Sequence, residues 1–189
     1  MSEGFVTISQ KLNSKGTERY WRKFVFPNNE SKKVAILILQ EPKYMDNRIE
    51  PALISAVNFV SNNHKQVYVF NLLPVKKEKL KIENIDYLKE VMRSNVSEIK
   101  SVVDNNYSSN NSVDLIYGAR VAKRFKNVNK NNELSEILLD TIKLLEKNKK
   151  IELKAFFDKD NCLAYTSYGK AVYSVKGYKT DALNSLLEQ

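Results

Sequence analysis

The feature that most constrains the fold is an uninterrupted apolar run at residues 34–39, Val-Ala-Ile-Leu-Ile-Leu. Apolar and polar side chains do not alternate in this run, which is the pattern of a strand buried on both faces. Such strands belong to parallel sheets that are covered by helices on either side. The run ends at Gln40, Glu41 and Pro42, so the sequence predicts a buried parallel strand that is followed directly by a polar turn.

Further segments predict strands of the same sheet. Residues 67–70, 113–117 and 151–157 are short segments rich in β-branched or aromatic side chains. A final short strand is expected at residues 171–175. Together with residues 34–39, the first three segments give a sheet of four main strands.

Helical patterns fill the intervals between these strands. After Asp46, which we expect to cap a helix, apolar residues recur every three or four positions from Ile49 to Val60. The same spacing predicts helices over residues 85–103 and 134–145, and Thr180 is expected to cap a closing helix. Strand, helix and strand in this order imply right-handed parallel crossovers.

These elements predict one α/β domain over residues 1–189, because this length suits a single core and no linker interrupts it. We expect a three-layer α/β/α arrangement around a mainly parallel, four-stranded sheet. Residues 1–33 form an N-terminal extension, in which the polar stretch 13–16 joins the two strands of a β-hairpin. Residues 105–111, rich in Asn and Ser, predict a mobile loop.

The charge balance favours an anionic partner. Lys and Arg total 31 against 22 Asp and Glu, which gives a formal charge of +9, and nucleic acid is the commonest partner of such a protein. The alternative is a solvated surface of mixed Lys and Glu clusters. DNA binding is therefore the first expectation, and a small-molecule module without nucleic acid is a competing one.

Cysteine and histidine counts bound the compartment and the chemistry. One Cys and one His cannot supply an intramolecular disulfide or a usual zinc site, so we expect a cytoplasmic protein without metal or cofactor. Residues 1–16 lack the apolar core of a signal peptide, and no apolar run approaches the roughly 20 residues that span a bilayer. A soluble monomer without membrane contact is the expectation.

Open parallel sheets bind ligands beyond the carboxyl ends of their strands. Four segments meet this rule: residues 40–44, 71–74, 117–120 and 165–174. The first reads Gln-Glu-Pro-Lys-Tyr after the buried strand, the second begins with Asn71, and the third contains Tyr117 and Gly118. We expect these turns to form the walls of one binding crevice.

The same turns resemble motifs of the uracil-DNA glycosylase superfamily. Residues 37–44 are similar to its first motif, a buried strand that ends in Gly-Gln-Asp-Pro-Tyr, and residues 69–73 resemble its apolar strand that ends in Asn. Residues 115–119 are similar to a later strand that ends in Trp-Gly. The chain also resembles an uncharacterised bacterial and phage family, domain of unknown function 1643. The resemblance implies a water-positioning role for Glu41 and a base-reading role for Asn71.

The final motif of that family, His-Pro-Ser, is absent. Residues 167–175 contain neither His nor Pro, and the only histidine, His64, follows the first helix, where we expect it on the surface. Losing a donor to the departing base costs about 3 to 4 kcal/mol in comparable oxyanion sites. We therefore expect a pseudo-enzyme that binds DNA, a protein inhibitor of glycosylases as a decoy, or both. The alternative is an active nucleobase- or nucleotide-processing N-glycosylase that uses Glu41 and Asn71.

The candidate residues fall into two groups, and each has a structural alternative. For the pocket residues the alternatives are structural: Pro42 starts a turn, Glu41 caps a helix and Asn71 satisfies backbone groups. We expect Gly118 to be structural, because glycine adopts backbone conformations that other residues resist. The pocket group comprises Gln40, Glu41, Pro42, Tyr44, Asn71, Tyr117, Gly118, Tyr173 and Ser174. The nucleic-acid group comprises Arg120, Lys123, Arg124, Lys126, Lys170 and Lys176, for which a solvated helix face is the alternative.

Overall fold

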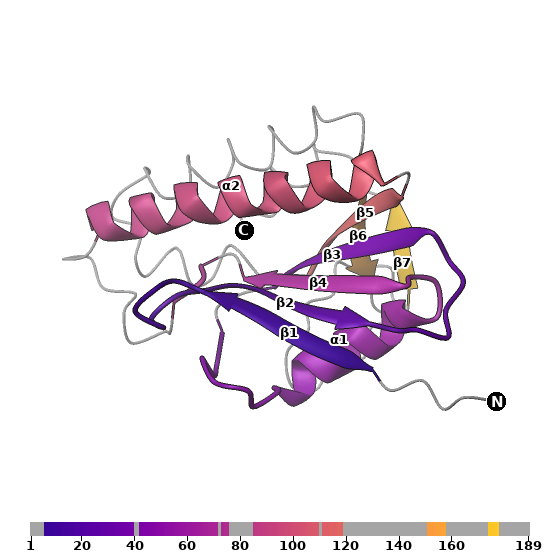
Figure 1. The fold of residues 1–189 in the computed structure, drawn as a ribbon, viewed down its shortest axis with the longest axis horizontal. Helices are drawn as coiled ribbons and strands as arrows, with labels where there is room; N and C mark the ends of the chain where they lie inside the picture. Colours follow the sequence, from indigo (N-terminus) through magenta and orange to yellow (C-terminus); the bar gives the residue numbers. More distant parts are fainter. Residues whose placement is uncertain are drawn as a thin grey trace.

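The computed structural model describes residues 6–39, 42–71, 73–75, 85–109, 111–118, 151–157 and 174–177. These residues build one seven-stranded sheet with the strand order β1-β2-β4-β3-β5-β6-β7 and two helices (Figure 1). The strands are β1 (Thr7–Leu12), β2 (Arg19–Val25), β3 (Lys33–Leu39), β4 (Gln66–Asn71), β5 (Ser112–Tyr117), β6 (Ile151–Phe157) and β7 (Ser174–Gly177). The helices are α1 (Pro51–Ser61) and α2 (Ile85–Ser108).

The four main strands predicted from the sequence form the parallel centre of this sheet. β3 pairs in parallel with β4 on one side and with β5 on the other, and β5 pairs in parallel with β6. The α/β class is therefore confirmed. The predicted sheet of four strands is too small, because β2 pairs antiparallel with β4 and β7 pairs antiparallel with β6. The sheet is mixed, and the N-terminal hairpin continues it instead of standing apart.

The buried strand β3 has the environment that its sequence predicts. Val34, Ile36 and Ile38 belong to a core cluster with α2, and Ala35 and Leu37 belong to a second cluster with α1. Because successive side chains of a strand point to opposite faces, α1 and α2 pack against opposite faces of the sheet. The apolar run at β3 is continuous because both of its faces are covered.

The β1–β2 turn is confirmed, and its residues have defined roles. The amide oxygen of Asn13 accepts hydrogen bonds from the backbone N–H groups of Thr17 (2.8 Å) and Glu18 (3.2 Å). Gly16 has a φ of 66°, a left-handed conformation that glycine adopts without a steric penalty. A side chain that caps the turn and a glycine at its tightest point explain why the polar stretch reverses the chain.

Two predictions about helix ends are wrong. The first helix begins at Pro51 with Glu50 as its N-cap residue, because Pro has no N–H to lose at a helix start and its φ already suits a helix. Asp46, which was expected to cap this helix, lies in the preceding loop and bonds to Arg48. The expected mobile loop at 105–111 is helical up to Ser108, where the buried Asn106 donates to the carbonyl of Val102 (2.8 Å).

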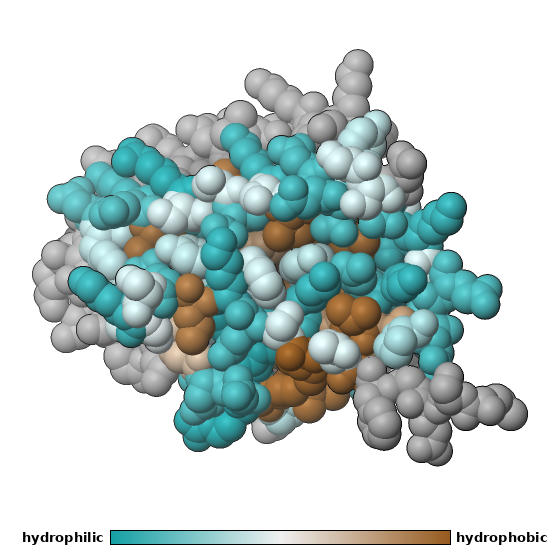
Figure 2. All heavy atoms as spheres, viewed as in Figure 1, coloured by the Kyte–Doolittle hydropathy of each residue, from teal (hydrophilic) through white to brown (hydrophobic). Residues whose placement is uncertain are grey.

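The predicted helices at 134–145 and after Thr180 lie outside the described residues. Within the described helices, none is long and apolar enough to cross a membrane. The face that presents β1 is largely hydrophilic, with apolar atoms gathered beside α1 in the lower part of the view (Figure 2). Large exposed apolar side chains of the described residues include Val6, Ile8 and Ile54.

Candidate functional site

The predicted turns after β3, β4 and β5 meet at one edge of the sheet, which we call the carboxyl edge. Leu39 is the register partner of Asn71, and Ile38 is the register partner of Tyr117. The backbone N–H of Gly118 also donates to the carbonyl of Ile38 (3.0 Å). The connection through α1 runs from β3 to β4 on one side, and the connection through α2 runs from β4 back past β3 to β5, so the direction in which strands are added reverses between β3 and β5. In parallel sheets, ligands bind at such a reversal.

Some of the predicted site residues can be placed at this edge. Pro42, Asn71 and Tyr117 are buried, and Tyr44 is half-buried. Ser174 begins β7 opposite Phe157, and Lys176 is exposed on the same strand. The other predicted residues lie outside the described part of the chain: Gln40, Glu41, Arg120, Lys123, Arg124, Lys126, Lys170 and Tyr173.

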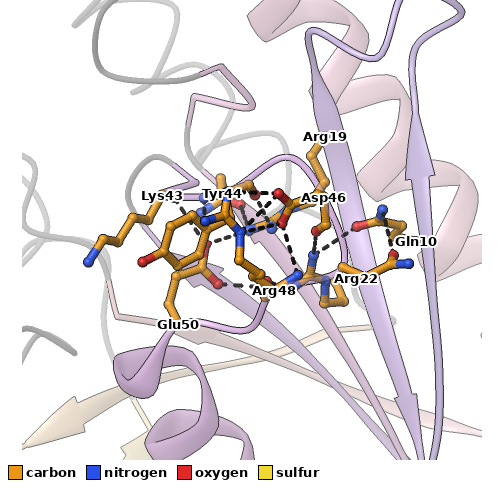
Figure 3. Close-up of polar contacts among 10 residues, drawn as sticks. Gln10, Arg19, Arg22, Lys43, Tyr44, Asp46, Arg48 and Glu50 are labelled. Atoms are coloured by element: carbon orange, nitrogen blue, oxygen red, sulfur yellow. Dashed lines mark hydrogen bonds and ion pairs between the residues drawn. The ribbon is translucent and has the colours of Figure 1, made fainter.

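The loop of residues 42–50, here called the edge loop, is held by two buried arginines of β2 (Figure 3). Arg19 Nη1 donates to the carbonyl of Tyr44 (2.7 Å). Arg22 donates to the carbonyls of Asp46 (2.6 Å) and Arg48 (2.8 Å). Three backbone carbonyls of one loop are thus bound by charged donors, which give stronger hydrogen bonds than neutral ones. The edge loop has a fixed conformation because the strand beneath it carries these guanidinium groups.

Glu50 is the carboxylate that faces both arginines. Its Oε1 lies 3.4 Å from Nη2 of Arg19, and its Oε2 lies 3.9 Å from Nη1 of Arg22. Oε1 also accepts hydrogen bonds from the backbone N–H groups of Lys43 (3.0 Å) and Tyr44 (3.2 Å). Burial lowers the pKa of Arg19 to about 10 although Glu50 acts in the opposite direction, and burial also lowers the pKa of Arg22. Two guanidinium groups share one carboxylate, so the edge retains positive charge.

Asn71 takes part in the same network. Its Oδ1 accepts a hydrogen bond from Nη2 of Arg19 (3.2 Å), and its backbone carbonyl accepts one from the side chain of Asn95 in α2 (2.7 Å). The amide oxygen of Asn71 therefore points at a buried guanidinium. This arrangement favours a structural role for Asn71 over the predicted role in recognising the edge of a base.

The outer side of the edge loop combines an aromatic ring with exposed cations. The guanidinium carbon of Arg48 lies 4.3 Å from the ring centroid of Tyr44, and Nζ of Lys43 lies 5.2 Å from it. Lys43 and Arg48 are exposed. A cation over an aromatic face is attracted electrostatically by the ring, and this attraction holds the cation beside it. This surface is suited to phosphate and to a flat base.

Gly118 is structural, as expected, but for a different reason. A Cβ atom at this position would lie 2.8 Å from Cδ2 of Phe156 and 3.2 Å from Cδ2 of Leu39. The described glycine with positive φ is Gly16. Gly118 is needed because β3 and β6 side chains approach its backbone closely, rather than because of its own conformation.

His64 is buried, and the prediction that it lies on the surface is wrong. Its Nδ1 contacts the carbonyl of Val60 and its Nε2 contacts Oδ2 of Asp114, each at 2.8 Å. Both ring nitrogens therefore lie within hydrogen-bond distance of an acceptor of the protein itself. Nζ of Lys154 also donates to Oδ2 of Asp114 (2.8 Å). This cluster ties the end of α1 to β5 and β6.

The His64 cluster lies at the amino ends of the parallel strands, because Asp114 stands near the start of β5. Burial alone would raise the pKa of Asp114, but the hydrogen bonds from His64 and Lys154 outweigh burial and hold this pKa below its usual value. A cavity of about 400 Å³ adjoins the cluster. As the sequence predicts, His64 is far from the carboxyl edge.

Sequence reasoning missed the buried charges at both edges. Arg19 and Arg22 stand in an N-terminal strand that was expected to be an extension, so nothing marked them as buried. Asp114 did carry a signal, since a lone carboxylate within an apolar strand requires a partner. The described residues contain no group of three or more His, Cys, Asp or Glu side chains that could hold a metal ion.

No protein-family model matches this sequence, and no curated protein is significantly similar to it. The relationship to uracil-DNA glycosylases therefore remains a prediction that rests on the motif residues.

Proposed function

We propose that this chain is a DNA-binding protein of uracil-DNA glycosylase-like architecture that does not excise bases efficiently. The observation that carries the proposal is the position of Asn71. It ends β4 beside Leu39, the residue that precedes the Gln-Glu-Pro turn, and its amide oxygen is bound to the buried Arg19. The ends of β3, β4 and β5 meet at one edge of the sheet, and the amide oxygen of the residue assigned to base reading is bound within the protein.

Contact with DNA is supported by the outer side of the edge loop. Lys43 and Arg48 are exposed beside the ring of Tyr44, and the whole chain carries a formal charge of +9. Cations of this kind neutralise phosphates, and aromatic rings stack on bases. Because Arg19 and Arg22 hold the loop backbone, little conformational entropy is lost when the loop binds.

Poor excision is supported by the position of the only histidine. Departure of a base leaves negative charge, which glycosylases of this type stabilise with a histidine at the same crevice. His64 lies at the opposite edge, where Val60 and Asp114 occupy both of its ring nitrogens. It has no free ring nitrogen to offer a ligand.

An excision assay tests this proposal. Single-stranded and duplex oligonucleotides that carry one uracil are incubated with excess protein, and abasic sites are detected by alkaline cleavage. We expect binding to uracil and thymine versions with equal affinity and no abasic sites above the protein-free background. Abasic sites that form in the wild type and disappear in Glu41→Gln would contradict the proposal and favour the active N-glycosylase.

The decoy version of the proposal has a competition test. A purified protein inhibitor of uracil-DNA glycosylase is added to the complex of this protein with labelled DNA. Displacement of the DNA would support a glycosylase-like edge that the inhibitor recognises. Unchanged DNA binding at saturating inhibitor would contradict the decoy version and leave DNA binding as the proposed function.

A further inference from the structure

A second polar pocket lies between the β1–β2 turn and α2. Its volume is about 520 Å³, and its lining includes Lys15, Glu18 and Tyr20 from the hairpin and Tyr87 and Glu90 from α2. Tyr87 and Glu90 are three positions apart and thus share one face of the helix. The pocket is distinct from the edge loop and uses none of its residues.

Glu18 supplies the central charge of this pocket. Its side chain accepts hydrogen bonds from the hydroxyl of Tyr20 at Oε2 (2.9 Å) and from the hydroxyl of Tyr87 at Oε1 (3.0 Å). Only 8% of the residue is exposed. Both donors are neutral, so the carboxylate is fixed in position without being neutralised.

The tyrosines stay in their neutral form over a wide pH range. Burial, followed by the hydrogen bond to Glu18, raises the pKa of Tyr20 to about 12. The same causes raise the pKa of Tyr87. The two hydroxyls therefore remain donors to Glu18 at neutral pH.

Glu18 differs from the other buried carboxylates of the described residues. Glu50 faces Arg19 and Arg22, and Asp114 faces His64 and Lys154. No Lys, Arg or His side chain of the described residues lies within ion-pair distance of Glu18. Lys15 lines the pocket without forming such a pair. A buried carboxylate is expected to have a cationic partner, because its desolvation is unfavourable and an ion pair offsets it.

We propose that this pocket binds an organic cation of the ammonium or guanidinium type. The cation contacts the carboxylate of Glu18, while Glu90 at the rim adds a second negative charge. The tyrosine rings provide aromatic surface beside the charge, which suits such cations. Because the tyrosines already hold the carboxylate, a ligand finds the site organised before it binds.

The test is a titration of the full chain that follows backbone amide chemical shifts. The probes are n-butylammonium and n-propylguanidinium, and n-butanol is the neutral control. We expect saturable shifts with the cations, confined to residues 13–20 and the first half of α2, and none with n-butanol. Tighter binding of n-butylammonium would indicate a lysine-like ligand, and tighter binding of n-propylguanidinium would indicate an arginine-like one.

Matched variants decide the role of the carboxylate. Glu18→Gln is expected to weaken cation binding about tenfold, because it removes the charge and retains a hydrogen-bond acceptor. Glu30→Gln removes an equal charge from an exposed position and should leave binding unchanged. Equal affinity in the wild type and Glu18→Gln, equal shifts with n-butanol, or shifts spread over the whole surface would each overturn the proposal.

A second pair of variants keeps the test decisive if Glu18→Gln does not fold. Glu90→Gln lies at an exposed position of α2 and should weaken cation binding severalfold. Lys15→Ala removes the one basic side chain that the described residues contribute to the pocket lining, and it should strengthen binding. No change in either variant would contradict the proposal.

Discussion

The two edges of the parallel strands each bury a cluster of charged side chains, yet the clusters hold different parts of the molecule. At the carboxyl edge, Arg19 and Arg22 bind three backbone carbonyls of the edge loop and share Glu50. At the amino edge, His64 and Lys154 converge on Asp114 and join elements of regular structure. Buried charge alone therefore does not mark a functional site. The carboxyl edge is the candidate because its cluster fixes a loop with exposed cations and an aromatic ring.

The largest expected loss of stability is at the carboxyl edge, where one buried carboxylate faces two buried arginines. Glu50→Gln removes the buried carboxylate that faces the guanidinium groups of Arg19 and Arg22, and we expect a loss of about 4 kcal/mol in the free energy of unfolding. Urea denaturation measures this loss. Asp46→Asn in the same loop removes an exposed carboxylate and should cost less than about 1 kcal/mol. Equal losses in the two variants would show that Glu50 does not balance the arginines.

A smaller loss is expected at the amino edge. Asp114→Asn removes the shared acceptor of His64 and Lys154, and we expect a loss of about 3 kcal/mol. The loss is smaller than for Glu50 because Lys154 keeps Glu152 at 3.2 Å. Thermal and urea unfolding measure it, with the exposed Glu152→Gln as control. A larger loss at Asp114 than at Glu50 would reverse the comparison.

Packing at the carboxyl edge gives the next effect. Gly118→Ala places a methyl group within 2.9 Å of the ring of Phe156, and we expect a loss of about 2 kcal/mol from the shifts that this requires. Gly177→Ala is the control, since no atom lies within 4 Å of its Cβ position. Gly118→Ala with the stability of the wild type would contradict the close approach of β3 and β6 to Gly118.

The smallest effect concerns the pH dependence of stability. The pKa of Asp114 in the folded protein is held below the ordinary value of 3.8, so the folded state favours the carboxylate. The contribution of the Asp114 carboxylate to stability is present above pH 3.8, and it is lost as pH falls through the lower pKa of the folded state. When the pH is lowered from 5 to 2, the free energy of unfolding should therefore fall less in Asp114→Asn than in the wild type. Urea unfolding at each pH measures this free energy. Parallel pH profiles would contradict this assignment.

The parallel strands could be predicted because burial on both faces leaves a continuous apolar pattern in the chain. Residues 34–39 and 67–70 show this pattern, and the structure has β3 and β4 there. The start of α1 was predicted less well. Asp46 is a good cap by residue type, but Pro51 is compatible only with the first turn of a helix and sets the boundary.

The partners of buried charges could not be predicted, because they are distant in sequence. Asp114 is 50 residues from His64, and Arg19 is 52 residues from Asn71. The pairing of β2 with β4 that brings Arg19 to the carboxyl edge is also non-local. Local patterns record which face of a strand is apolar, but they do not record which strand lies beside it.

The most direct test of the account is the salt dependence of DNA binding in two double variants. Fluorescence anisotropy with a labelled duplex is measured from roughly 50 to 200 mM salt, the range over which phosphate contacts lose most affinity. Lys43→Ala with Arg48→Ala removes the exposed cations of the edge loop, and Lys100→Ala with Arg93→Ala removes equal charge from exposed positions of α2. We predict weaker binding and a slope reduced by roughly 2 in the first variant, and the wild-type slope in the second. Equal effects in both variants, or wild-type binding that does not depend on salt, would contradict a DNA site at the edge loop.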